Sequence, residues 1–80
     1  MIPRRRNPSQ LRRAIGLAIR RERESRRLTL DQLAARCGCS RSTLQRWESG
    51  RAGIDSLELV ARALRVPLAA LVDREPEGAS

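Results

Sequence analysis

The sequence has 80 residues and a formal net charge of +8 at pH 7, and all 17 of its basic residues are arginines. This length suffices for one small domain, and no run approaches the ~20 apolar residues of a membrane span or the apolar core of a signal peptide. Without histidine, tyrosine or a glycine-rich phosphate loop, the chain offers no catalytic residue, cofactor site or small-molecule ligand.

Residues 1–8 are expected to form a flexible basic arm, since they show no apolar periodicity. The arm contains Arg4, Arg5 and Arg6, and residues 1–27 together hold ten arginines against two glutamates. A chain so basic favours a polyanion, most commonly nucleic acid, as its partner. Once DNA is bound, such an arm is suited to contact phosphates or the minor groove.

A first helix is predicted from Pro8 or Ser9 to about Arg26, because apolar residues repeat at helical spacing. Its expected inner face consists of Leu11, Ile15, Ala18 and Ile19. Leu17 lies off this stripe, so it is either simply exposed or a partner contact. A basic amphipathic helix also suits an anionic membrane surface, but the helices that follow need this apolar face for their core.

A second helix is predicted to begin after Thr29, with Gln32 completing a capping box. Gly38 should end this helix, because it readily adopts the left-handed conformation that other residues resist. Cys37 and Cys39 flank that glycine; they lie too close in sequence for a comfortable disulfide, and two thiols without histidine cannot complete a zinc site. We expect both to be small buried apolar residues in a reducing cytoplasm.

Ser40 is expected to cap a third helix running from Arg41 to about Ser49, with Gly50 as its stop. Leu44 and Trp47 would point inward, Trp47 as a packing residue at the edge of the core. The outer face would then present arginine and small polar side chains, as a helix entering the major groove must. These expected base-reading residues are Arg41, Ser42, Thr43, Gln45 and Arg46.

Asp55 with Glu58 is predicted to cap a fourth helix, and Pro67 to start a short fifth helix ending near Val72. Residues 73–80 are acidic and contain proline and glycine, so we expect a disordered tail. No alternating apolar pattern indicates a strand, so the chain is expected to be all-α.

Residues 15–72 resemble the Cro/C1-type helix-turn-helix family of phage and bacterial repressors, also called the Xre family. The segments that carry the resemblance are 15–23, 28–34, 38–50 and 57–66, and the Trp-Glu-Ser-Gly ending of the third helix is especially typical. The resemblance implies a compact five-helix, lambda-repressor-like domain over residues 9–72.

The resemblance also implies roles for single residues. Arg41, Ser42, Thr43 and Arg46 match base-facing positions, with Gln45 beside them. Arg23 and Glu48 match a partly buried ion pair that ties the first helix to the third. The expected phosphate contacts are Thr29, Ser40, Arg51 and the three arginines of the arm.

Three departures from the family pattern bear on the phosphate contacts. The position that is often a phosphate-gripping glutamine is Leu30 here. The loop from Gly50 to Leu57 is about two residues short and lacks the common proline. The arginine-rich extension before Ile15 is longer than usual and would replace the contacts that are lost.

The sequence therefore predicts a sequence-specific DNA-binding transcriptional regulator, a repressor that acts in the cytoplasm on the nucleoid. Half-site recognition by one small domain favours a homodimer on a palindromic site. Two alternatives remain open: an antitoxin-type regulator that also binds a partner protein, and a protein-binding adaptor that has lost DNA contact.

Overall fold

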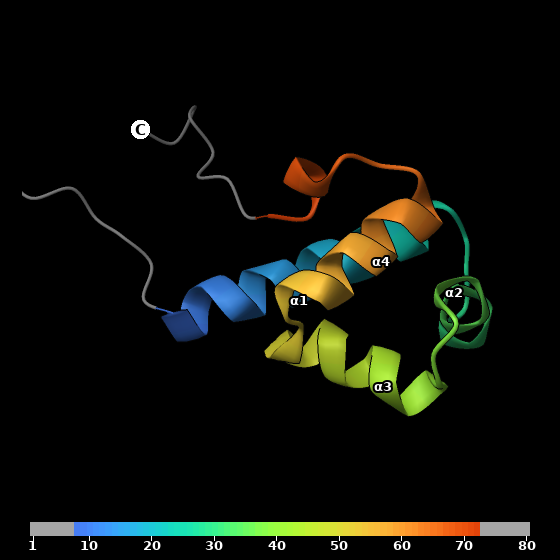
Figure 1. Cartoon of the computed structure of the whole chain (residues 1–80), viewed down its shortest axis with the longest axis horizontal. Coiled ribbons are helices and arrows are strands. Elements are labelled where there is room, and N and C mark those ends of the chain that lie inside the picture. The colour runs from blue at the N-terminus through green and yellow to red at the C-terminus, as the bar shows by residue number, and fades with distance from the viewer. Residues whose placement is uncertain (1–7, 73–80) are drawn as a thin grey trace, which may run out of the picture.

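The computed structural model describes residues 8–72, and every regular element in that range is helical (Figure 1). The elements are α1 (Pro8–Ser25), α2 (Leu30–Cys37), α3 (Arg41–Arg46), the wide turn η1 (Trp47–Arg51), α4 (Ile54–Leu64) and the 3₁₀ turn η2 (Leu68–Ala70). The all-α class is confirmed. The expected arm and acidic tail lie almost wholly outside the described residues. Over residues 8–72, no helix is long and apolar enough to cross a membrane.

Three predicted helix boundaries or counts were wrong. The α-helical geometry of α3 stops at Arg46, and η1 continues as one wider turn that ends where Gly50 adopts φ +106°. The cap of α4 is Gly53 rather than Asp55, because the extended Gly53 backbone already accepts the first helical bond from Leu57 N at 3.0 Å. The short fifth helix is the single 3₁₀ turn η2, which begins after Pro67 as predicted but ends at Ala70 rather than near Val72.

The core joins all four α-helices through aliphatic side chains. Its buried members are Ile19, Leu33, Ala34, Cys37, Leu44, Leu57, Val60, Ala61, Leu64 and Leu71. Burying a side chain of leucine size contributes about 1.5–3 kcal/mol, so this cluster is the main source of stability for so short a chain. No polar side chain is buried in the described part.

The inner face of α1 is narrower than the sequence pattern indicated. Ile19 is fully buried and Ile15 packs against the core, but Leu11 remains 38% exposed. Figure 1 shows the reason, because the first turns of α1 extend beyond the other helices described in residues 8–72. Leu17 is exposed as expected.

The two thiols are free, with Cys37 buried and Cys39 half-buried, so the expectation of full burial was wrong for Cys39. Cys39 lies just beyond the Gly38 turn, where the chain leaves the α2 inner face. Burial, together with the neighbouring Cys39 thiol, raises the pKa of Cys37 to about 11.

Alkaline unfolding is expected to report on this buried thiol. The folded state holds the Cys37 proton more tightly than the unfolded chain, so stability is constant below pH 9 and falls by about 2 kcal/mol between pH 9 and pH 11. The chain has no lysine, tyrosine or histidine, so the other side chain that titrates near that range is Cys39, whose pKa is also raised by burial. Urea unfolding at stepped pH measures the effect, and Cys37→Ala should abolish most of the fall; an equal fall in that variant would contradict the assignment.

The closest approach between elements brings the backbone of α1 against η1. Gly16 sits at this crossing: a Cβ placed there would lie 2.8 Å from Glu48 C, 2.9 Å from Gly50 N and closer still to Glu48 O. Only glycine allows two backbones to come this near. The crossing fixes the end of α3 on α1.

Candidate nucleic-acid interface

The helix-turn-helix unit is built by two side-chain caps and one left-handed glycine. Thr29 Oγ1 accepts from Gln32 N at 3.1 Å, and Thr29 N donates to Gln32 Oε1 at 2.8 Å, which completes the capping box of α2. At the other end Gly38 adopts φ +74°, and Cys39 N donates to Ala34 O at 3.0 Å. The chain changes direction within the three residues between the two helices, so α3 starts directly beside the end of α2.

Ser40 then caps α3. Its hydroxyl accepts from Thr43 N at 3.1 Å and donates to Thr43 Oγ1 at 2.9 Å, while the Ser42 hydroxyl lies 3.3 Å away. The hydroxyls of Ser40 and Thr43 are thus engaged in holding the first turn of α3, and Thr43 is only half-exposed. In the free protein these two hydroxyls order the first turn of α3. The long side chains of α3 extend farthest from the helix.

The exposed polar residues of α3 are Arg41, Ser42, Gln45 and Arg46, and Leu44 beneath them is fully buried. Arg41 Nη1 lies 3.9 Å from Asp31 Oδ2 on α2, with side chains 59% and 72% exposed. A pair this open contributes little to stability, so Arg41 is held only loosely.

Glu48, the one acidic residue of the α3–η1 segment, faces away from this surface. Arg23 Nε donates to Glu48 Oε2 at 2.7 Å and Nη2 to Oε1 at 3.3 Å, and the two side chains are only 11% and 10% exposed. Arg23 Nη1 also donates to Leu28 O at 2.8 Å, at the start of the segment that leads into α2. One guanidinium therefore joins α1, η1 and the α1–α2 connection.

Trp47 is half-buried and packs against the core from its edge, with Leu44 one turn earlier in the interior. This places the indole under the α3–η1 junction. The indole therefore contributes to the packing of the core edge.

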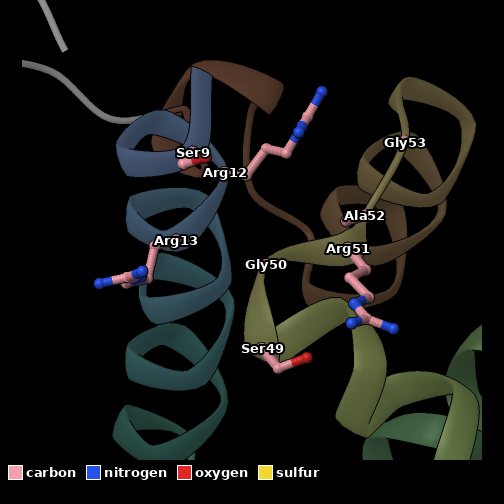
Figure 2. A pocket seen from close by; sticks show the side chains of 8 residues that line it. All are labelled: Ser9, Arg12, Arg13, Ser49, Gly50, Arg51, Ala52 and Gly53. Atoms are coloured by element: carbon pink, nitrogen blue, oxygen red, sulfur yellow. The ribbon is translucent and has the colours of Figure 1, made fainter. Parts of the chain in front are cut away.

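The expected phosphate contacts lie at two ends of this surface. Thr29 and Ser40 are exposed at the starts of α2 and α3, whereas the Leu30 side chain packs partly against the core. Arg51 is exposed at the end of η1 and lines an open hollow beside the N-terminal half of α1 (Figure 2). Arg4, Arg5 and Arg6 lie outside the described residues.

Residues 9–13 of α1 belong to the arginine-rich extension before Ile15 that was expected to replace phosphate contacts, but none of them was named as a candidate site residue. Ser9, Arg12 and Arg13 line the same hollow as Arg51, together with Ser49, Gly50, Ala52 and Gly53. The sequence carried one usable signal, because arginines in the first turns of a helix oppose its macrodipole and need another reason to be there. Their nearness to η1 depends on the Gly16 crossing, which no local pattern revealed.

The arginines farther along α1 are largely neutralised. Arg20 Nε bonds Glu24 Oε2 at 3.1 Å, and Arg26 pairs with Glu22 across one turn. Arg12 and Arg13 have no ion pair within residues 8–72. Arg21 also has no ion pair within this range, so two of the three uncompensated arginines of α1 lie in its N-terminal half, close to η1.

Comparison with known proteins gives a consistent picture. A helix-turn-helix family model matches residues 19–71, which is 53 of the 80 residues. The chain is similar to the crystal structure of the clp gene regulator ClgR from C. glutamicum, with TM-score 0.71, 33% identity, and coverage of 76% of this chain and 82% of that one.

The fold is also similar to that of a hypothetical transcription factor, NHTF, from Neisseria. The TM-score is 0.74 at 21% identity, over 99% of this chain and 93% of that one. At this identity the likeness concerns the fold alone. No curated protein matches the sequence.

Proposed function

Because the chain belongs to the Cro/C1-type helix-turn-helix (Xre) family of DNA-binding transcription regulators, we propose that it is a repressor that places α3 in the major groove of a specific site. It is a DNA-binding regulator and not an enzyme. The base-reading residues we propose are Arg41, Ser42, Thr43, Gln45 and Arg46.

The observation that carries this proposal is that the cationic side chains of α3 and η1 are oriented differently from the apolar and acidic ones. The apolar residue Leu44 and the acid Glu48 turn toward the body, while the cations Arg41 and Arg46 stay exposed. Guanidinium groups bond the O6 and N7 acceptors of guanine, and the Gln45 amide suits adenine. On an ordinary solvated helix face, there would be no reason for the only carboxylate to be buried.

Around this reading face, we propose Thr29, Ser40 and Arg51 as contacts to DNA phosphates, with the arm adding Arg4, Arg5 and Arg6. Contacts of this kind position the protein without selecting sequence. Each neutralised phosphate steepens the dependence of affinity on salt.

Replacing a base-reading arginine should separate specific from general binding. Arg41→Ala or Arg46→Ala is expected to weaken the preferred site by roughly 10- to 100-fold and random duplex by only about threefold, because a bidentate arginine–guanine pair discriminates by about 1–3 kcal/mol. Titration of both duplexes by fluorescence anisotropy measures this.

The preferred site for that titration comes from selecting bound sequences out of a random duplex pool. Arg62→Ala, an exposed arginine in the last turn of α4, is the matched control and should leave both affinities nearly unchanged. Equal losses on both duplexes would reduce Arg41 and Arg46 to phosphate contacts.

The same selection tests the proposed homodimer on a palindromic site. Two inverted half-sites at a constant spacing of about one helical turn support it, and a single half-site contradicts it. An antitoxin-type regulator would show the same DNA binding and a co-purifying partner protein, whereas a protein-binding adaptor would bind no duplex in a salt-dependent way.

A further inference from the structure

The hollow between α1 and η1 has the composition of an anion site. It has a volume of about 620 Å³, opens to solvent, and is lined by three arginines and two serines without any acidic residue. The remaining lining residues are Gly50, Ala52 and Gly53, which leave the backbone accessible. No apolar anchor is present, so the chemistry favours a charged, hydrated ligand over an apolar one.

The positive charges of the arginines in this hollow do not stabilise the fold. Arg12 lies in the N-terminal half of α1, and the first turn contains no acidic residue to balance it. Arg51 is a second cation on the opposite wall. A bound anion would relieve this repulsion.

Position ties the hollow to the surface of α3. Ser49 Oγ donates to Arg46 O at 2.8 Å, so the rim of the hollow begins one turn after a proposed base-reading residue. The walls keep their separation because the backbones of α1 and η1 meet at Gly16 and Gly50, whose Cβ position would lie 3.4 Å from Arg12 O. We expect a nucleic-acid strand that borders α3 to reach this opening.

The directions of the side chains limit what can be bound. In Figure 2, Arg12 extends from α1 beside the gap and Arg51 hangs from η1 toward Ser49, at the other end of the opening, whereas Arg13 points to the far side of α1. Two guanidinium groups aimed at different ends do not chelate one phosphate. Each of them is free to hold a separate phosphate.

We propose that this hollow is a backbone clamp in which Arg12 and Arg51 hold neighbouring phosphates of one DNA strand. The assignment rests on the proposed DNA-binding function. It also gives the N-terminal extension of α1 a defined role. The short loop after η1 supplies a phosphate contact only through Arg51, and Arg12 adds a second contact from a rigid helix.

Salt-dependent affinity of the full chain for a random-sequence duplex tests the clamp. Arg12→Ala and Arg51→Ala should each weaken binding about fivefold at 0.1 M salt and reduce the slope of log Kd against log salt by about 0.9, and the double variant should lose both contributions. Arg13→Ala is the matched control, because it removes the same charge from the next residue; it should change Kd by less than twofold.

Phosphate positions are then assigned on the selected site. Single methylphosphonate substitutions should reveal two adjacent phosphates on one strand, one of which becomes silent in Arg12→Ala and the other in Arg51→Ala. Equal effects of Arg12→Ala and Arg13→Ala, or no silent position in either variant, would overturn the clamp in favour of a diffuse positive field. Failure of the unaltered chain to bind any duplex would instead overturn the proposed function.

Discussion

Gly16→Ala is expected to destabilise the protein by roughly 3 kcal/mol, at the upper end of the cost of overpacking a well-packed core. The added methyl would sit 2.8 Å from Glu48 C and 2.9 Å from Gly50 N. Both neighbours are backbone atoms, so no side chain can rotate away, and α1 must move off η1. Urea denaturation followed by circular dichroism measures the loss of unfolding free energy.

Gly53→Ala is the control for this glycine. Nothing lies within 4 Å of a Cβ at residue 53, and the extended backbone there suits any residue. We expect a change below about 1 kcal/mol, because only conformational entropy and the preference for glycine at a helix start are involved. Similar losses at both positions would show that the crossing tolerates a larger separation than the structure indicates.

Displacing η1 has a second consequence, for DNA binding. The clamp residues Arg12 and Arg51 lie on opposite sides of the same crossing, so separating the backbones widens the hollow as well. In folded Gly16→Ala protein at low temperature, affinity for random duplex should therefore fall although no charge has been removed.

Glu48→Ala is expected to cost about 3 kcal/mol. The substitution leaves the Arg23 guanidinium, only 11% exposed, with Leu28 O and the exposed Glu24 carboxylate, 3.9 Å away, as its remaining partners. Removing one partner of a largely buried pair is costly because the other charge stays desolvated. Thermal and urea unfolding measure the loss, and the folded variant should also bind its preferred site more weakly because η1 holds the end of α3.

A charge-free replacement distinguishes this cause from general loss of packing. Arg23→Met combined with Glu48→Leu should recover much of the stability lost by Glu48→Ala, since apolar side chains of similar size need no charged partner. Glu24→Ala, which removes an exposed partner of Arg20 on the same helix, should cost less than about 0.5 kcal/mol. A double variant no more stable than Glu48→Ala would contradict desolvated charge as the source.

The orientation of α3 is therefore expected to depend on two contacts, both of them between α1 and η1. The Gly16 crossing sets how closely η1 approaches α1, and the Arg23–Glu48 pair fixes the rotation of η1 about its axis. With the carboxylate of Glu48 drawn inward, the exposed face of α3 keeps only neutral and positive side chains. Fold stability and the electrostatic character of the reading face are therefore coupled.

The local elements followed directly from the amino-acid sequence. The capping box of Thr29 and Gln32, the left-handed Gly38 and the Ser40 cap each act within four residues, so residue type and spacing were enough to place α2 and the start of α3. The same holds for the apolar spacing of α4 and for the outward direction of Arg41 and Arg46 once Leu44 is directed inward. Pattern and propensity agree there, because no distant contact competes with them.

Only the tertiary structure decided which residues from separate elements meet. Leu11 fits the apolar repeat of α1 but remains exposed because the helix extends beyond its neighbours, and Gly53 rather than Asp55 starts α4 because the chain emerging from η1 is already extended there. The contact of Gly16 with η1 and the nearness of Arg12 to Arg51 link residues more than thirty positions apart. Helical periodicity determines the face on which a side chain lies, but the packing of whole helices determines what lies opposite that face.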